Sequence, residues 1–113
     1  MFDTEERIHE VNIPADQKQR IKDFLQGSVY CWCKNRRNEQ FKLQDLVGGD
    51  NTDWTATPLN VLYERHIASG HTHDSAMTTA AQDAGWLLKG TLKDDPRQFR
   101  RSKEYTNSYQ WLS

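Results

Sequence analysis

Lysine and arginine residues gather near the end of the chain, where their positive charges could neutralise phosphate groups. Residues 84–113 contain six of them, against the three acids Asp94, Asp95 and Glu104. The six are Lys89, Lys93, Arg97, Arg100, Arg101 and Lys103. The formal charge of the whole chain is −1, so this surplus is local. If the six side chains formed one continuous strip, they would make a binding surface for a polyanion.

Histidines and cysteines could also bind a ligand, but their spacing does not favour zinc. Cys31 and Cys33 are separated by one residue, whereas zinc sites usually separate their cysteines by two to four. On a helix the two thiols would point about 200° apart. His71 and His73 could pair in a loop, yet no third ligand is evident. His66 falls on an apolar face, where a hydrogen-bonded core histidine is expected. We therefore expect neither a metal nor another cofactor.

Catalysis would require a nucleophile beside a base, or paired carboxylates in a cleft. Cys33 and His66 are a conceivable pair, but Cys33 belongs to an apolar stripe, where burial would raise the pKa of the thiol and make it inert. Asp50 and Asp53 have the character of turn residues. We expect that the protein is not an enzyme and that both cysteines are free thiols.

Three amphipathic helices are predicted to carry these residues. The first spans residues 16–36, with Asp16 as its N-cap and apolar residues spaced by three and four. The second begins at Thr57-Pro58 and ends at Gly70, which suits the left-handed residue after a helix. The third begins at Asp74 or Ser75 and ends before Pro96. Its apolar stripe places Asp83 on the opposite, exposed face.

The remaining segments are shorter. Residues 41–43 could form a strand, or residues 43–47 a short helix. Residues 97–112 predict a β-hairpin with its tip within 102–107, in which Tyr109 and Trp111 share one face because they are two residues apart. The sequence thus predicts a mainly α (α+β) fold of three long helices and a C-terminal β-hairpin. This domain would cover residues 14–113, after a flexible acidic arm of residues 1–13.

This order of elements resembles a winged helix-turn-helix domain. The resemblance implies that residues 75–92 form the helix that enters the major groove of duplex DNA, and that the hairpin is the wing. Thr78, Thr79 and Gln82 would read base edges, and Lys89 and Lys93 would neutralise phosphates. The wing would add Arg100, Arg101 and Lys103. The implied function is DNA binding by a transcriptional regulator.

A second interpretation is a small protein-interaction module or adaptor subunit without enzymatic activity. In that case Tyr109 and Trp111 would be anchors against a protein partner or a second copy of the chain, because aromatic residues are common at interfaces. No apolar run approaches the roughly 20 residues of a membrane span. The N-terminus lacks the apolar core of a secretory signal. We therefore expect a cytoplasmic protein with no membrane partner.

Overall fold

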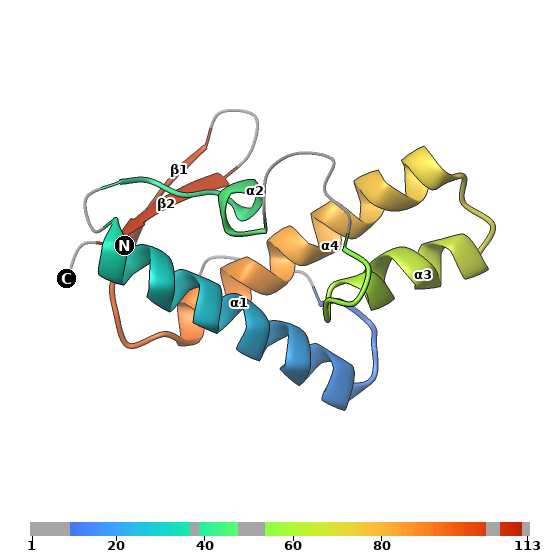
Figure 1. Cartoon of the computed structure of the whole chain (residues 1–113), viewed down its shortest axis with the longest axis horizontal. Coiled ribbons are helices and arrows are strands. Elements are labelled where there is room, and N and C mark those ends of the chain that lie inside the picture. The colour runs from blue at the N-terminus through green and yellow to red at the C-terminus, as the bar shows by residue number, and fades with distance from the viewer. Residues whose placement is uncertain (1–9, 37–38, 48–53, 104–106, 112–113) are drawn as a thin grey trace.

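The computed structural model describes residues 10–36, 39–47, 54–103 and 107–111, without the side chains of residues 103 and 107. Within them lie the helices α1 (Ala15–Asn35), α2 (Leu43–Leu46), α3 (Asn60–Ala68) and α4 (His73–Asp94). The strands β1 (Phe99–Lys103) and β2 (Asn107–Trp111) follow and pair antiparallel (Figure 1). The predicted fold class, three long helices and a C-terminal hairpin, is confirmed.

Helix α1 is held by a stripe of apolar residues spaced four apart. Ile21, Leu25, Val29 and Cys33 are all buried, because this spacing brings them to one side of a helix. The helix begins one residue earlier than predicted, with Pro14 at its N-cap. Pro14 makes no side-chain hydrogen bond to the first turn.

Helices α3 and α4 form a hairpin whose connection contains Gly70. This glycine has a φ of 96°, the left-handed conformation predicted for it. Helix α3 begins later than expected, since the hydroxyl of Thr57 donates to the carbonyl oxygen of Trp54 rather than capping the helix. Thr72, not Asp74 or Ser75, caps α4: its hydroxyl oxygen accepts the backbone N–H of Ser75 at 3.2 Å.

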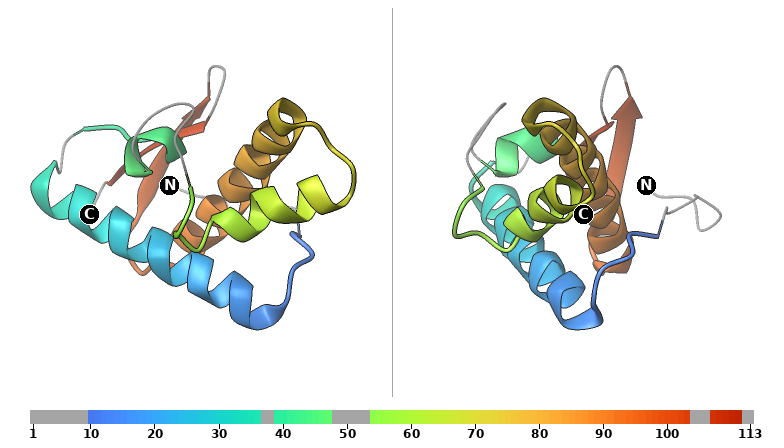
Figure 2. Two further views of the ribbon diagram at one scale, coloured as in Figure 1. Left: turned by 45° about the vertical axis from the view of Figure 1, so that its right-hand side comes forward. Right: turned by 90° about the vertical axis from the view of Figure 1, so that its right-hand side faces the viewer.

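Helix α4 is the central element of the fold. It contacts α3, α1 and α2, and Figures 1 and 2 show it crossing α1 and running back along α3. Its second half is buried on several sides at once, at Leu87, Leu88, Lys89, Thr91 and Leu92. A helix with so many neighbours cannot present a broad solvent-exposed face along that half.

The hairpin is joined to the rest of the fold by Phe41. The backbone N–H and C=O of Phe41 each bond to Tyr109, both at 2.7 Å, so that Phe41 adds a one-residue bridge beside β2. The sequence allowed a strand at residues 41–43 or a short helix at residues 43–47. Both are present in shorter form, as a bridge at Phe41 and a four-residue helix after it. The ring of Phe41 lies edge-on to Phe99 in the core.

The described part of the predicted N-terminal arm is packed. Val11 is 2% exposed and belongs to the hydrophobic core, and the carbonyl oxygen of Asn12 accepts a hydrogen bond from Arg65 at 2.8 Å. Residues 1–9 of that arm lie outside the described residues. In the part of the chain that is described, no helix combines the length and the apolar character that crossing a membrane requires.

Candidate functional site

The helix face predicted to meet DNA is only partly accessible. Thr78 and Gln82 are exposed, and Thr79 is half-buried. The hydroxyls of both threonines donate to backbone carbonyl oxygens four residues earlier. Lys89 was expected on the same exposed face, and this expectation is wrong. The residue is 5% exposed, with its ammonium 5.3 Å from the centre of the Trp86 ring.

Arg97 is bound inside the molecule. Its guanidinium Nε and Nη2 donate to the two carboxylate oxygens of Asp95, at 3.0 and 2.6 Å. Its guanidinium carbon also lies within 6 Å of three ring centres, those of Tyr30, Phe99 and Trp111. Burial by itself would raise the pKa of Asp95, but hydrogen bonds from Arg97 and Gln26 outweigh it and lower the pKa. The arginine and this carboxylate therefore neutralise each other.

The two arginines of β1 are exposed but diverge. Arg100 pairs across the hairpin with Gln110, and Arg101 with Tyr109, so the two side chains leave opposite faces of the strand. Lys93 is exposed at the end of α4, and the side chain of Lys103 lies outside the described residues. With Lys89 and Arg97 withdrawn, the described members of the six do not form a continuous cationic strip.

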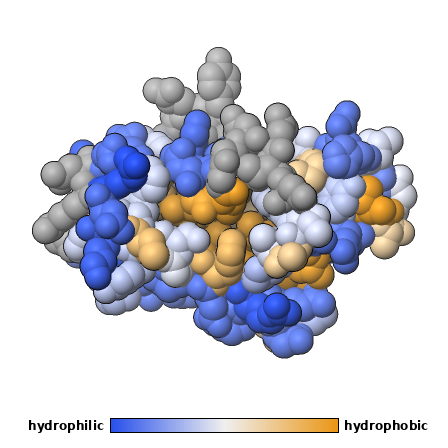
Figure 3. All heavy atoms as spheres, viewed as in Figure 1, coloured by the Kyte–Doolittle hydropathy of each residue, from blue (hydrophilic) through white to orange (hydrophobic). Residues whose placement is uncertain are grey.

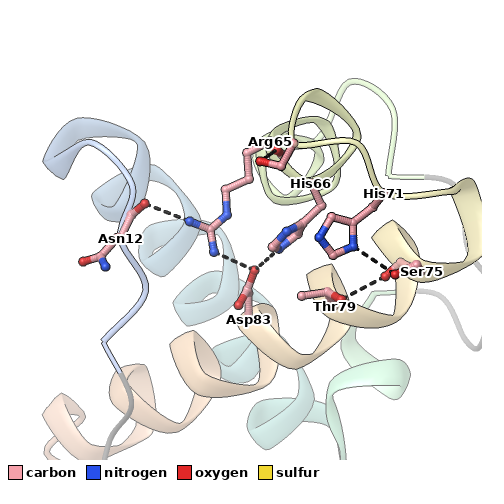
Figure 4. Close-up of polar contacts among 8 residues, drawn as sticks. Asn12, Arg65, His66, His71, Ser75, Thr79 and Asp83 are labelled. Carbon is pink, nitrogen blue, oxygen red and sulfur yellow. Dashed lines mark hydrogen bonds and ion pairs between the residues drawn. The ribbon is translucent and has the colours of Figure 1, made fainter.

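Asp83 occupies a buried polar cluster instead of an exposed face (Figure 4). One carboxylate oxygen accepts from Arg65 Nη2 at 2.9 Å and from His66 Nε2 at 2.7 Å. The Asp83 and His66 side chains are 12% and 14% exposed. His66 is thus the hydrogen-bonded core histidine that was predicted, and the exposed position predicted for Asp83 is wrong. A usable signal existed: Asp83 falls in phase with the buried Ala76, Ala80 and Leu87.

A second polar contact adjoins this cluster at the start of α4. His71 Nδ1 lies 2.9 Å from Ser75 Oγ, and the rings of His66 and His71 are 5.1 Å apart (Figure 4). A serine at hydrogen-bond distance from a histidine resembles a nucleophile and base. Both residues are exposed to solvent, however. Their arrangement serves to connect α3 with α4.

The aromatic pair expected at an interface is divided by the fold. Tyr109 is 2% exposed and packs against Phe41 in the core, so it cannot anchor a partner as proposed from the sequence. Trp111 is half-buried, on the same face of the hairpin as Tyr109. Among the other tryptophans, Trp54 is buried in the hydrophobic core, and Trp32 and Trp86 are partly buried and pack against that core.

The two cysteines are free, as predicted, and differ in environment. Cys31 is exposed and Cys33 is buried. Burial raises the pKa of the Cys33 thiol above its ordinary value, and nearby Arg97 counters this only in part. Among the described residues no group of three histidine, cysteine or acidic side chains could hold a metal ion.

The sequence did not reveal an open groove between α1 and α2. Small residues of α1 line it, Gly27, Ser28 and Cys31, together with the larger Phe24 and Trp32. Leu46 of α2 forms the opposite wall, and the polar lining residues are Asn35, Arg36 and Asp45. In the view of Figure 1, hydrophobic residues gather in the middle of the molecule, with hydrophilic ones around them (Figure 3).

Comparison of the chain with protein-family models, with curated proteins and with solved structures finds no match.

Proposed function

We propose that this protein is a non-catalytic interaction module that binds an apolar segment of a partner protein in the groove between α1 and α2. The observation that carries this proposal is the groove itself, an open depression lined by Phe24, Trp32 and Leu46 on a very polar protein. Apolar side chains gathered in one depression give an apolar segment of a partner a surface against which to bury itself.

The shape and chemistry of the groove favour an amphipathic helix as the occupant. Its wall on α1 runs from Phe24 to Arg36, about 18 Å at 1.5 Å per residue, which corresponds to about three turns of an incoming helix. Gly27 and Cys31 are small and one turn apart, so another backbone could approach closely there. The polar groups lie toward Arg36, which suits a partner helix whose apolar face ends in a polar or acidic residue.

The test uses synthetic 14-residue amphipathic helices, selected by display against the full chain, as probes. Gly27→Leu adds a bulky side chain to the groove, and its Cβ meets no atom within 4 Å. We expect this substitution to weaken peptide binding by at least about tenfold, the scale of one anchor residue. Gln19→Leu is the matched control, since it adds the same side chain to an exposed position of α1 outside the groove, and it should change affinity less than about twofold.

The exposed thiol of Cys31 provides an independent readout. A bound helix should protect Cys31 from maleimide labelling, because this residue lines the groove. The proposal fails if no selected peptide binds, or if those that bind neither protect Cys31 nor respond to Gly27→Leu.

DNA binding is the second candidate, favoured by one observation. The order of α1, the Phe41 bridge, α3, α4 and the hairpin follows the order of the winged-helix resemblance. If this function is correct, affinity for a DNA duplex falls steeply with salt. Arg100→Ala together with Arg101→Ala should then flatten the slope of log affinity against log salt by about 1.8, for two lost phosphate contacts. Failure to retain any duplex at low ionic strength would exclude it.

We place either function in the cytoplasm. An exposed thiol such as that of Cys31 stays reduced in this compartment, which suits the location.

A further inference from the structure

Strand β1 lies at the edge of the small sheet. In the described residues β1 pairs only with β2, and β2 is bordered on its other side by Phe41. The two 2.7 Å bonds between Phe41 and Tyr109 show that the backbone of Tyr109 points toward Phe41 and away from β1. The sheet therefore has a bordered side and, at β1, an outer side.

The orientation of the Tyr109 backbone determines which backbone groups of β1 face outward. In an antiparallel pair, residues alternate between hydrogen-bonded and non-hydrogen-bonded partners. Because Tyr109 turns its backbone toward Phe41, its partner Arg101 occupies a non-hydrogen-bonded position. The backbone N–H and C=O of Arg101, and those of Phe99 and Lys103 in the same phase, therefore point away from β2.

The side chains of this edge strand carry positive charge. β1 reads Phe-Arg-Arg-Ser-Lys, and exposed Arg100 and Arg101 leave its two faces. Positive charges on an edge strand discourage pairing with a strand of like charge, including β1 of a second copy. A strand bearing carboxylates on both faces would instead meet one arginine on each face.

We propose that the outer edge of β1 binds an extended acidic segment of a partner protein by strand addition. Backbone bonds to the outward groups of β1 supply the pairing, and Arg100 and Arg101 select acidic side chains. This surface is separate from the groove between α1 and α2, since none of the lining residues of the groove belongs to β1. Failure of the groove proposal would leave this one unaffected.

The test compares three synthetic eight-residue peptides of β-favouring sequence by fluorescence anisotropy against the full chain. One repeats Thr-Thr-Glu-Glu, so that glutamates lie on both faces of an extended strand. The second replaces each glutamate with lysine, and the third is the acidic peptide with every backbone nitrogen methylated. We expect the acidic peptide to bind at least about tenfold more tightly than the lysine peptide, since each opposite-charge pair contributes up to about fivefold. The methylated peptide should not bind, because it cannot complete the backbone pairing.

Charge reversal provides the control within the protein. Arg100→Glu together with Arg101→Glu should invert the preference toward the lysine peptide, while circular dichroism verifies that both proteins are equally folded. Bound acidic peptide should slow amide exchange at Arg101 more than at Arg100, whose backbone faces β2. Equal binding of all three peptides, or binding of a DNA duplex without binding of the acidic peptide, would overturn the proposal.

Discussion

Replacing Asp83 with alanine should lower the stability of this protein far more than replacing an acidic residue on its surface would. The substitution removes the carboxylate that accepts both the Arg65 and the His66 hydrogen bonds. It leaves a guanidinium and an imidazole in a cluster where the His66 side chain is 14% exposed. The Nε of Arg65 is already buried without a hydrogen-bond partner, so this cluster has little capacity to absorb a further loss.

The magnitude follows from burial. Removing one partner of a buried ion pair costs about 3–5 kcal/mol, because the remaining charge is left uncompensated. The Arg65 side chain is 30% exposed and can reach water, which reduces the cost to about 2–3 kcal/mol. For a domain of 113 residues each kcal/mol lowers Tm by about 4 °C. We therefore expect Asp83→Ala to lower Tm by about 8–12 °C.

The matched control is Asp94→Ala. The carboxylate of Asp94 forms an ion pair with Lys22 at 2.7 Å, but the Asp94 side chain is 69% exposed. An exposed pair contributes at most about 1 kcal/mol, or about 4 °C. Urea and thermal denaturation, followed by tryptophan fluorescence, measure both variants. Equal losses for Asp83→Ala and Asp94→Ala would show that burial does not determine the strength of these pairs, and the reasoning would be refuted.

Three further predictions concern single residues. Cys31 should react with a thiol reagent at pH 8 at least about tenfold faster than Cys33, because Cys31 is exposed whereas Cys33 is buried with a raised pKa; comparable rates in native protein would contradict this. Asp95→Asn should destabilise the protein at pH 7. Because the pKa of Asp95 is lowered in the folded state, its stabilising effect is lost on protonation, and the difference in stability from wild type should shrink as the pH falls below 3.8. Urea denaturation at pH 7 and pH 3 measures this difference, and a difference that stays constant would contradict the prediction. Gly27→Ala should stabilise α1 by up to about 1 kcal/mol, whereas Gly70→Ala should destabilise the protein by about the same amount because of its φ of 96°; effects of the same sign would argue against this account.

Local patterns in the sequence were sufficient for the secondary structure. The buried stripe of α1, the left-handed Gly70 and the hairpin with Tyr109 and Trp111 on one face all follow from spacing and residue type, which act between neighbours along the chain. Helix starts were less accurate, because a threonine hydroxyl can bond backbone groups before or after it in the chain. Thr57 donates to Trp54, before it, whereas Thr72 accepts from Ser75, after it. The burial of Cys33 was also predictable, since it depends only on its place in the stripe.

Only the tertiary structure decided which polar side chains are available. Asp83 and Lys89 looked exposed when α4 was considered as a helix with one buried face, but α4 has neighbours on several sides. Likewise, Arg97 was counted as a free cation until the fold placed it against Asp95 and three aromatic rings. The groove between α1 and α2 joins residues up to 22 positions apart, from Phe24 to Leu46. Helical periodicity describes one element at a time, whereas burial, charge pairing and grooves arise between elements that are distant in sequence.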